Sequence, residues 1–225
     1  GFVALPCSQD HKRVSEGDVG LNTGGMGAYA PAPVVTKEVR NRAIQEIVEP
    51  MHVHLSSQST PYRGCLYVGL MIDESGAPSV VEYNVRFGDP ETQVTVPLIS
   101  SDLCDLLLAV AEGRLADSMP TFHDAHAMTV VLAAEGYPGP PVKGRLIGGD
   151  ISPSWQPTTE GKYLIHHAGT GLEDGKLIST GGRVLAATGI SENSLESAKN
   201  LAYKCLSKVQ LEGSHFRRDI GHRAL

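Results

Sequence analysis

The order of apolar and polar positions predicts two helices and a β-hairpin in the first half of the chain. Apolar residues recur at the three- and four-residue spacing of a helix after Thr36 and again after Asp102, and both residues are typical helix N-caps. Between these segments lie two apolar runs, 62–72 and 79–86, joined by a polar turn that contains glycine. Two such runs around a short turn predict a hairpin.

The segments around these elements are also informative. Residues 1–7 are typical of a short strand, whereas residues 8–33 are polar and rich in glycine. A connection of that length is uncommon unless it has a function. Pro50 is expected to end or kink the first helix, and Gly113 to end the second.

The pattern changes after Leu115. A single clear helix is expected within 191–211, where an apolar stripe indicates core packing. The rest consists of short β-like runs separated by Gly and Pro turns, at 127–134, 144–147, 163–167, 176–179 and 182–188. Such runs indicate a small barrel or sandwich. We therefore expect an α+β protein with two domains, 1–115 and 116–225.

Composition narrows the class of protein. With 225 residues, 41% of them hydrophobic, the chain has enough apolar material for a core. Its net charge of −6 argues against a nucleic-acid surface, and no apolar run reaches the roughly 20 residues of a membrane span. The four cysteines lack the spacing of a disulfide framework or a zinc site, so reduced thiols in the cytoplasm are expected. Because the chain starts with Gly1 inside a strand-like run, it is expected to begin within a longer protein.

The end of the hairpin carries the strongest chemical signal. Glu82, Asn84 and Arg86 alternate along the second apolar run, so they are expected to share one face of a strand. Carboxylate and amide oxygens suit Mg²⁺, which is often held by one or two protein groups together with substrate phosphates. The arginine suits a phosphate or carboxylate. A surface strand with a simple Glu–Arg pair is the alternative explanation.

The glycine-rich segment adds a second signal. Lys12 precedes a loop in which Thr23, Gly24, Gly25 and Gly27 are close together. Glycines let backbone amides surround an anion, and the lysine adds positive charge. A flexible loop is the alternative. The segment matches neither a P-loop nor the dinucleotide fingerprint, but beside the hairpin motif it favours a site for nucleotide phosphates.

Longer motifs identify a family. Ser-Gln-Asp-His-Lys-Arg at 8–13, Asn-Thr-Gly-Gly-Met-Gly-Ala-Tyr at 22–29 and Glu-Tyr-Asn-Val-Arg-Phe-Gly-Asp-Pro-Glu at 82–91 occur in order, followed by His-Ala-Gly-Thr at 167–170 and Gly-Gly-Arg-Val at 181–184. Together they resemble the phosphoribosylamine–glycine ligase family of the ATP-grasp superfamily. The resemblance implies the later part of an ATP-grasp core, an antiparallel sheet with helices, followed by the family's C-terminal domain.

The resemblance also implies an activity. The family joins glycine to 5-phosphoribosylamine with ATP, through a glycyl phosphate, in purine biosynthesis. Carried onto this chain, Glu82 and Asn84 resemble ligands of Mg²⁺ or Mn²⁺ between the ATP phosphates, and Arg86 resembles the arginine beside the acyl phosphate. Lys12 and the loop with Thr23, Gly24, Gly25 and Gly27 resemble elements that close over substrate and phosphates. The parent enzyme is expected to be a monomer or part of a multifunctional purine enzyme.

Two departures limit the expectation. Residues 66–71 carry no further acidic metal ligand, and the family's adenine-binding segment is absent from these 225 residues. The chain is therefore expected to hold about half of such an enzyme and to be inactive alone. Another ATP-grasp ligase or carboxylase, or a non-catalytic interaction module, are the alternative functions.

Overall fold

The computed structural model describes residues 1–152 and 154–225, which form two compact units that interleave along the chain. Residues 1–7, 32–88 and 99–123 make the first unit. Residues 8–31, 89–98 and 124–225 make the second. The division into domains 1–115 and 116–225 stays a prediction.

In the first unit, one long helical segment begins at Thr36, whose hydroxyl accepts from the Val39 amide. It comprises α1 (Lys37–Ala43), a π-helical turn (Ile44–Val48) and α2 (Glu49–Ser56). Pro50 was expected to end or kink this helix, but it lies in the first turn of α2, directly after the π turn. A π turn disrupts the regular hydrogen-bond ladder, so the missing amide of a proline is accommodated there.

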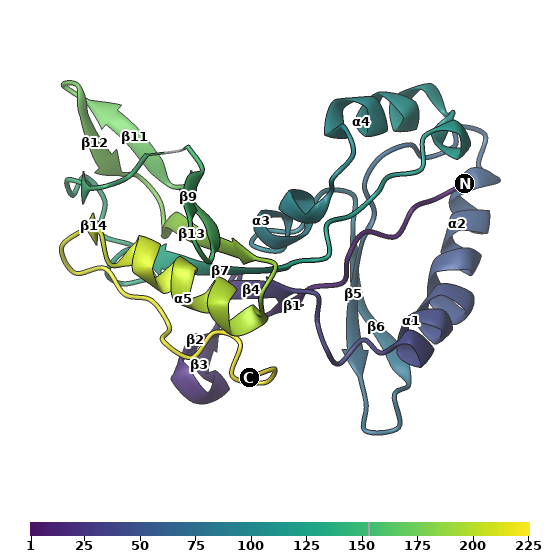
Figure 1. Cartoon of the computed structure of the whole chain (residues 1–225), viewed down its shortest axis with the longest axis horizontal. Coiled ribbons are helices and arrows are strands. Elements are labelled where there is room, and N and C mark those ends of the chain that lie inside the picture. The colour runs from purple at the N-terminus through teal and green to yellow at the C-terminus, as the bar shows by residue number, and fades with distance from the viewer. Residues whose placement is uncertain (153) are drawn as a thin grey trace. The chain divides into compact units, whose positions relative to one another are not determined.

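The first unit also contains the hairpin, formed by β5 (Tyr67–Ile72) and β6 (Pro78–Asn84) (Figure 1). Its turn is fixed by Asp73, whose Oδ1 accepts from the amides of Ser75 and Ala77. The hairpin is confirmed, but β5 begins five residues later than expected and β6 ends two residues earlier. Residues 1–7, expected as a strand, have no regular structure.

A second helix of the first unit, α4 (Leu103–Glu112), matches its sequence signals closely. The Asp102 carboxylate caps its first turn by accepting from the Asp105 amide, and Gly113 ends it in the left-handed conformation. A short 3-10 turn follows at Leu115–Asp117.

The second unit is built on a six-stranded antiparallel sheet in the order β1-β4-β7-β13-β10-β9. Figure 1 labels β1, β4, β7, β13 and β9 of this sheet. Its strands are β1 (Gln9–Asp10), β4 (Gly27–Ala30), β7 (His126–Ala133), β13 (Arg183–Ser191), β10 (Gly161–His167) and β9 (Gln156–Thr158). Strands β1 and β9 are its two edges. Among the described residues the sheet is therefore open, where the sequence indicated a barrel or sandwich; the α+β class is confirmed.

Smaller elements complete the second unit. They are β2 (Arg13–Ser15), a 3-10 turn (Glu16–Asp18), β3 (Val19–Asn22), α3 (Thr92–Thr95), a 3-10 turn (Val96–Leu98), β8 (Gly148–Gly149), β11 (Thr170–Glu173), β12 (Lys176–Ser179) and β14 (Val209–Gln210). The glycine-rich segment 8–33, expected as a connection, thus contributes four strands. The run 144–147 is not a strand; β8 follows it directly.

Helix α5 (Leu195–Leu206) packs on the central strands of this sheet. Its buried stripe includes Ala198, Leu201 and Ala202, as the helical spacing indicated. Gly189 of β13 makes this approach possible, because a Cβ there would lie 2.2 Å from the Ala198 carbonyl oxygen. Burying a leucine of this kind contributes about 2 kcal/mol.

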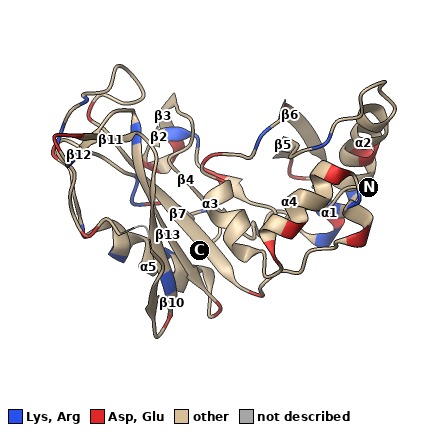
Figure 2. Cartoon of the chain, turned by 90° about the horizontal axis from the view of Figure 1, so that it is seen from above, with Lys and Arg blue, Asp and Glu red and all other residues tan. Residues whose placement is uncertain are grey.

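The charged residues do not form a single basic face. Figure 2 shows Lys and Arg interspersed with Asp and Glu over the helices and strands of each unit, which agrees with the net charge of −6. Within the described residues, no helix has both the length and the apolar character needed to cross a membrane.

Candidate functional site

Glu82 and Asn84 lie on β6 of the first unit, opposite Gly69 and Tyr67 of β5. Because they are two residues apart on a strand, their side chains point to the same face. Glu82 is exposed and Asn84 is half-buried. A Cβ at position 69 would lie 3.1 Å from the Glu82 Cγ, so the glycine leaves the Glu82 side chain room that another residue would reduce.

This pair fits a magnesium ion. One carboxylate and one amide oxygen on a shared face are hard oxygen ligands, and two protein ligands suffice when phosphates and water complete the coordination. Because Glu82 is exposed, an ion held there would be accessible to phosphates and water. The donor set and its accessibility therefore match a metal that binds protein and nucleotide phosphates together.

Arg86 is not on the strand with the other two. Strand β6 ends at Asn84, and Arg86 lies in an exposed bend where its Nη1 donates to the Phe87 carbonyl at 2.8 Å. The expectation that all three side chains share one strand face was wrong for this residue. The chain leaves the hairpin immediately after Asn84 toward the buried Gly88, so the alternation no longer applies.

The apolar side chains that alternate with Glu82 and Asn84 in the sequence are exposed. Val81 is 64% exposed and Val85 is 72% exposed. A two-stranded sheet leaves such side chains in water, whereas a larger sheet can bury them, so this hairpin is the less stable arrangement.

In the second unit, the glycine-rich loop is held by its own polar groups. The Thr23 hydroxyl donates to the Lys12 carbonyl at 2.8 Å and accepts from the Gly25 amide at 2.9 Å. The Gly24 amide donates to the Tyr137 hydroxyl at 2.9 Å. These two glycine amides, expected to surround an anion, are thus engaged within the chain in this conformation.

The glycines of the loop have different roles. Gly25 has a φ of +115°, and a Cβ there would lie 2.4 Å from Pro90 Cδ and 2.8 Å from Asp10 Oδ1. Gly27 lies in β4, where a Cβ would lie 2.6 Å from the Thr129 carbonyl oxygen. Gly27, expected in the phosphate loop, is therefore required by sheet packing.

Beside this loop lie two buried carboxylates, Asp10 and Glu91, that are not among the predicted site residues. Burial and the neighbouring Glu91 raise the pKa of Asp10 to about 6, although Lys12 opposes the shift. The Lys12 Nζ lies 2.8 Å from Asp10 Oδ2, and the lysine side chain is half-exposed. Asp10 lies in the family motif at 8–13 and Glu91 in the motif at 82–91, and this membership is the feature of the sequence that marks them.

A second cluster in this unit has the composition of a metal site but is already neutralised. His11, Asp18 and His222 bring their ligand atoms within 4.8 Å of one another. Asp18 accepts from Arg217 and Arg223, and the His11 Nε2 accepts from the Gly221 amide. Two guanidinium groups on the only carboxylate disfavour a cation, so the cluster is structural.

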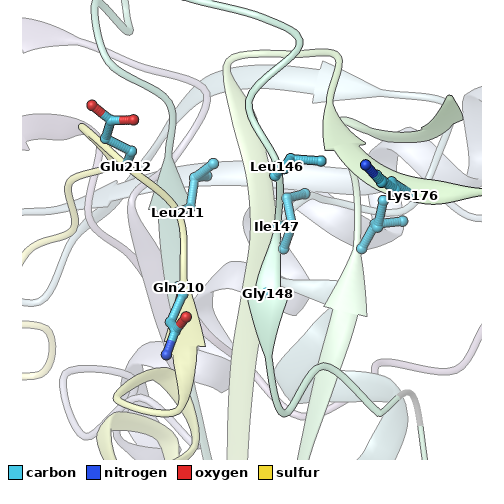
Figure 3. Close-up of a pocket in the computed structure, with 8 residues that line it drawn as sticks. Leu146, Ile147, Gly148, Lys176, Gln210, Leu211 and Glu212 are labelled. Atoms are coloured by element: carbon cyan, nitrogen blue, oxygen red, sulfur yellow. The ribbon is translucent and has the colours of Figure 1, made fainter. Parts of the chain in front are cut away.

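The second unit also has a hollow of about 430 Å³ near β8, β12 and β14. Figure 3 shows its labelled side chains, among them Leu146, Lys176 and Glu212. None of the residues that line it belongs to the motifs, so the predicted site is elsewhere.

Two family models match the chain. "Phosphoribosylglycinamide synthetase, ATP-grasp (A) domain" matches residues 1–92, and the C domain of the same family matches residues 127–223. The chain belongs to the phosphoribosylglycinamide synthetase family. It is 47% identical over 223 residues to the phosphoribosylamine–glycine ligase of Pseudomonas aeruginosa, covering 99% of this chain and 51% of that protein. It is 46% identical over 224 residues to the bifunctional purine biosynthetic protein PUR2,5 of Pichia angusta, covering 99% of this chain and 28% of that protein.

Solved structures agree with this family assignment. The phosphoribosylamine–glycine ligase of Thermotoga maritima superposes with a TM-score of 0.83 at 39% identity, covering 98% of this chain and 52% of that one. The biotin carboxylase subunit of pyruvate carboxylase gives a TM-score of 0.61 at 15% identity, covering 92% and 42%, which shows a shared fold alone. The chain thus spans about half the length of the ligases it matches.

Proposed function

We propose that this chain is the later half of a phosphoribosylamine–glycine ligase, which joins glycine to 5-phosphoribosylamine and releases ADP and phosphate. The observation that carries the proposal is the shared face of Glu82 and Asn84 on β6, with Gly69 opposite the carboxylate. This pair of oxygen donors occurs in a chain that belongs to the phosphoribosylglycinamide synthetase family. The proposed reaction passes through a glycyl phosphate.

In the proposed reaction, Glu82 and Asn84 would be the residues that hold Mg²⁺, or Mn²⁺ in its place. When bound, the metal would supply neutralisation of charge for phosphoryl transfer from ATP to the glycine carboxylate. Arg86, exposed just after the strand, places its positive charge near that developing phosphate. Each of these groups binds or orients, and none has to take a proton.

Lys12 and the Thr23–Gly27 loop are proposed to close over substrate and phosphates. The half-exposed Lys12 supplies positive charge, and its ammonium group pairs with the Asp10 carboxylate in this conformation. Because the Gly24 and Gly25 amides are engaged within the chain, amide contacts to an anion require the loop to rearrange when the substrate binds. The glycines lower the cost of that rearrangement.

We propose that the chain alone does not catalyse ligation. Val81 on β6 and Val85 just after this strand are exposed, and the related ligases are about twice as long as this chain. The remaining half supplies the adenine contacts and covers this apolar face. The parent protein works in the cytoplasm, either as a monomeric ligase or within a multifunctional purine enzyme, and the Pichia relative supports the second arrangement.

The test is ADP release by the complete gene product that contains this chain, compared with residues 1–225 alone. Release that depends on ATP, Mg²⁺, glycine and phosphoribosylamine together is the expected result for the complete protein, and none is expected for the chain alone. Release that depends on bicarbonate instead of glycine would assign another ATP-grasp reaction. Absence of metal-dependent ATP binding in the complete protein would assign a non-catalytic module.

A further inference from the structure

Arg183, the first residue of β13, connects two segments that lie far apart in the sequence of the second unit. Its Nη1 donates to the Gly24 carbonyl at 2.9 Å and to the Asp89 carbonyl at 2.7 Å. Its Nη2 donates to the Asp89 carboxylate at 3.0 Å. One guanidinium thus joins the glycine-rich loop to the residue that begins the Asp89–Pro90 turn.

The surroundings of Arg183 hold it in this place. Its carbonyl accepts from the Gly169 amide at 2.9 Å, and a Cβ at Gly169 would lie 2.7 Å from that carbonyl oxygen. The preceding Gly182 packs against the Tyr137 ring, which a Cβ would approach to 2.3 Å. The Tyr137 hydroxyl in turn accepts a hydrogen bond from the Gly24 amide. The motifs at 167–170 and 181–184, which the proposed reaction does not use, therefore build the support of this arginine.

The loop is shaped to receive the guanidinium. A Cβ at Gly24 would lie 3.1 Å from Arg183 Cζ, so a larger residue there would press on it. The next residue, Gly25, lies against Pro90 in the same way. Arginine suits this position because its planar fork donates in several fixed directions at once, whereas lysine offers a single point charge.

We propose that Arg183 is a positioning residue that anchors the Thr23–Gly27 loop to the Asp89–Pro90 turn through the Gly24 carbonyl, so that the loop amides turn toward substrate from a fixed place. The inference rests on the proposed function, because it assigns the loop to that reaction. Arg183 acts through the loop and the turn; it is not assigned a contact with substrate. A misplacement of about 1 Å at a reacting centre costs on the order of 10²-fold in rate.

The first measurement needs no activity. Hydrogen exchange in residues 1–225 is compared between the parent chain, R183M, R183K and the control R145M. Arg145 is a matched control, since it is similarly buried in the same unit and joins a carboxylate, Glu135, to a carbonyl, that of Glu212. In R183M we expect faster exchange in segments 23–26 and 89–91 and unchanged exchange in β10 and α5. R183K should lie between R183M and the parent.

Two results of the exchange measurement would overturn the inference. One is loop exchange in R183M equal to that in R145M. The other is a uniform increase over the whole six-stranded sheet, which would show general destabilisation rather than positioning.

The second measurement is kinetic and uses the complete gene product. We expect R183M to lower kcat on the order of 10²-fold, R183K to recover part of it, and R145M to retain the parent rate. If the parent enzyme is active and R183M and R145M turn over equally, the positioning role of Arg183 is refuted and the proposed ligase function is not. An inactive parent enzyme would refute the proposed ligase function and would leave the exchange result to stand for itself.

Discussion

The guanidinium of Arg217 lies against the carboxylate of Asp18, with 2.9 Å between Nη1 and Oδ1. Arg217 is 1% exposed, and a second carboxylate, Asp219, lies 2.7 Å from its Nη2. Burial alone would raise the pKa of Asp18, but the hydrogen bonds from Arg217 and Arg223 hold it well below its usual range. Asp18 and Arg217 are nearly two hundred positions apart in the sequence. Their ion pair therefore joins the start of the second unit to its final residues.

Replacing Arg217 is therefore expected to destabilise the chain. R217M leaves the two carboxylates without their buried partner and should lower the free energy of unfolding by about 3 kcal/mol. The neighbouring Arg218 is exposed, so R218M should change it by less than about 0.5 kcal/mol. Urea unfolding of the two variants makes the comparison. Equal losses would mean that the buried pair contributes nothing particular.

The buried Asp10 predicts an unusual pH dependence. Its pKa is raised to about 6 from 3.8, so the folded chain binds a proton more tightly than the unfolded chain does. The contribution of this group to stability is therefore present below about pH 4 and is lost as the pH rises toward 6 and beyond. D10N removes the ionisation, and it should gain stability relative to the parent as the pH rises from 4 to 7, on the order of 3 kcal/mol.

His11, the next residue, has the opposite effect in the parent chain. Burial, aided by Arg217, lowers its pKa to about 4 from 6.5, so its contribution is present above about pH 6.5 and is lost as the pH falls toward 4. The effects of Asp10 and His11 on the pH dependence of stability partly cancel. D10N is therefore expected to reveal the rise in stability with pH that His11 causes. The exposed D174N serves as the control, and a D10N slope equal to that of D174N would contradict the assignment.

The contact of Gly25 with its neighbours predicts a local strain. G25A combines a φ of +115° with a Cβ 2.4 Å from Pro90, so it should cost about 2 kcal/mol or more of stability. G17A is the control, because Gly17 also has a positive φ, +70°, but a Cβ there would meet nothing within 4 Å. Thermal unfolding of both variants is the measurement. A smaller loss in G25A than in G17A would refute the close approach.

How far the sequence predicts this structure depends on the element. The caps at Thr36 and Asp102 and the stripe of α5 act locally, and the helices that they predict are present. The small strands within 8–33 could not be recognised, because strands of two to four residues show too little periodicity. The second partner of β4, strand β7, also lies far along the chain.

The candidate site shows the same division. Glu82 and Asn84 share a face because alternation along a strand is local, whereas Arg86 lies beyond the point where β6 ends. The role of Arg183 could not be derived from spacing, since its partners Gly24 and Asp89 are brought to it only by the fold. Its motif was visible in the sequence, but its contacts were not.

The most direct test of the account replaces Glu82 in the complete gene product. E82A is expected to abolish ADP release that depends on glycine and phosphoribosylamine, because Glu82 is proposed as a metal ligand. The unfolding midpoint should not change, because Glu82 is exposed and adds no core volume. E74A, at an exposed position in the turn of the same hairpin, should retain the parent rate. Turnover by E82A at the rate of E74A, at any magnesium concentration, would contradict the metal site on β6.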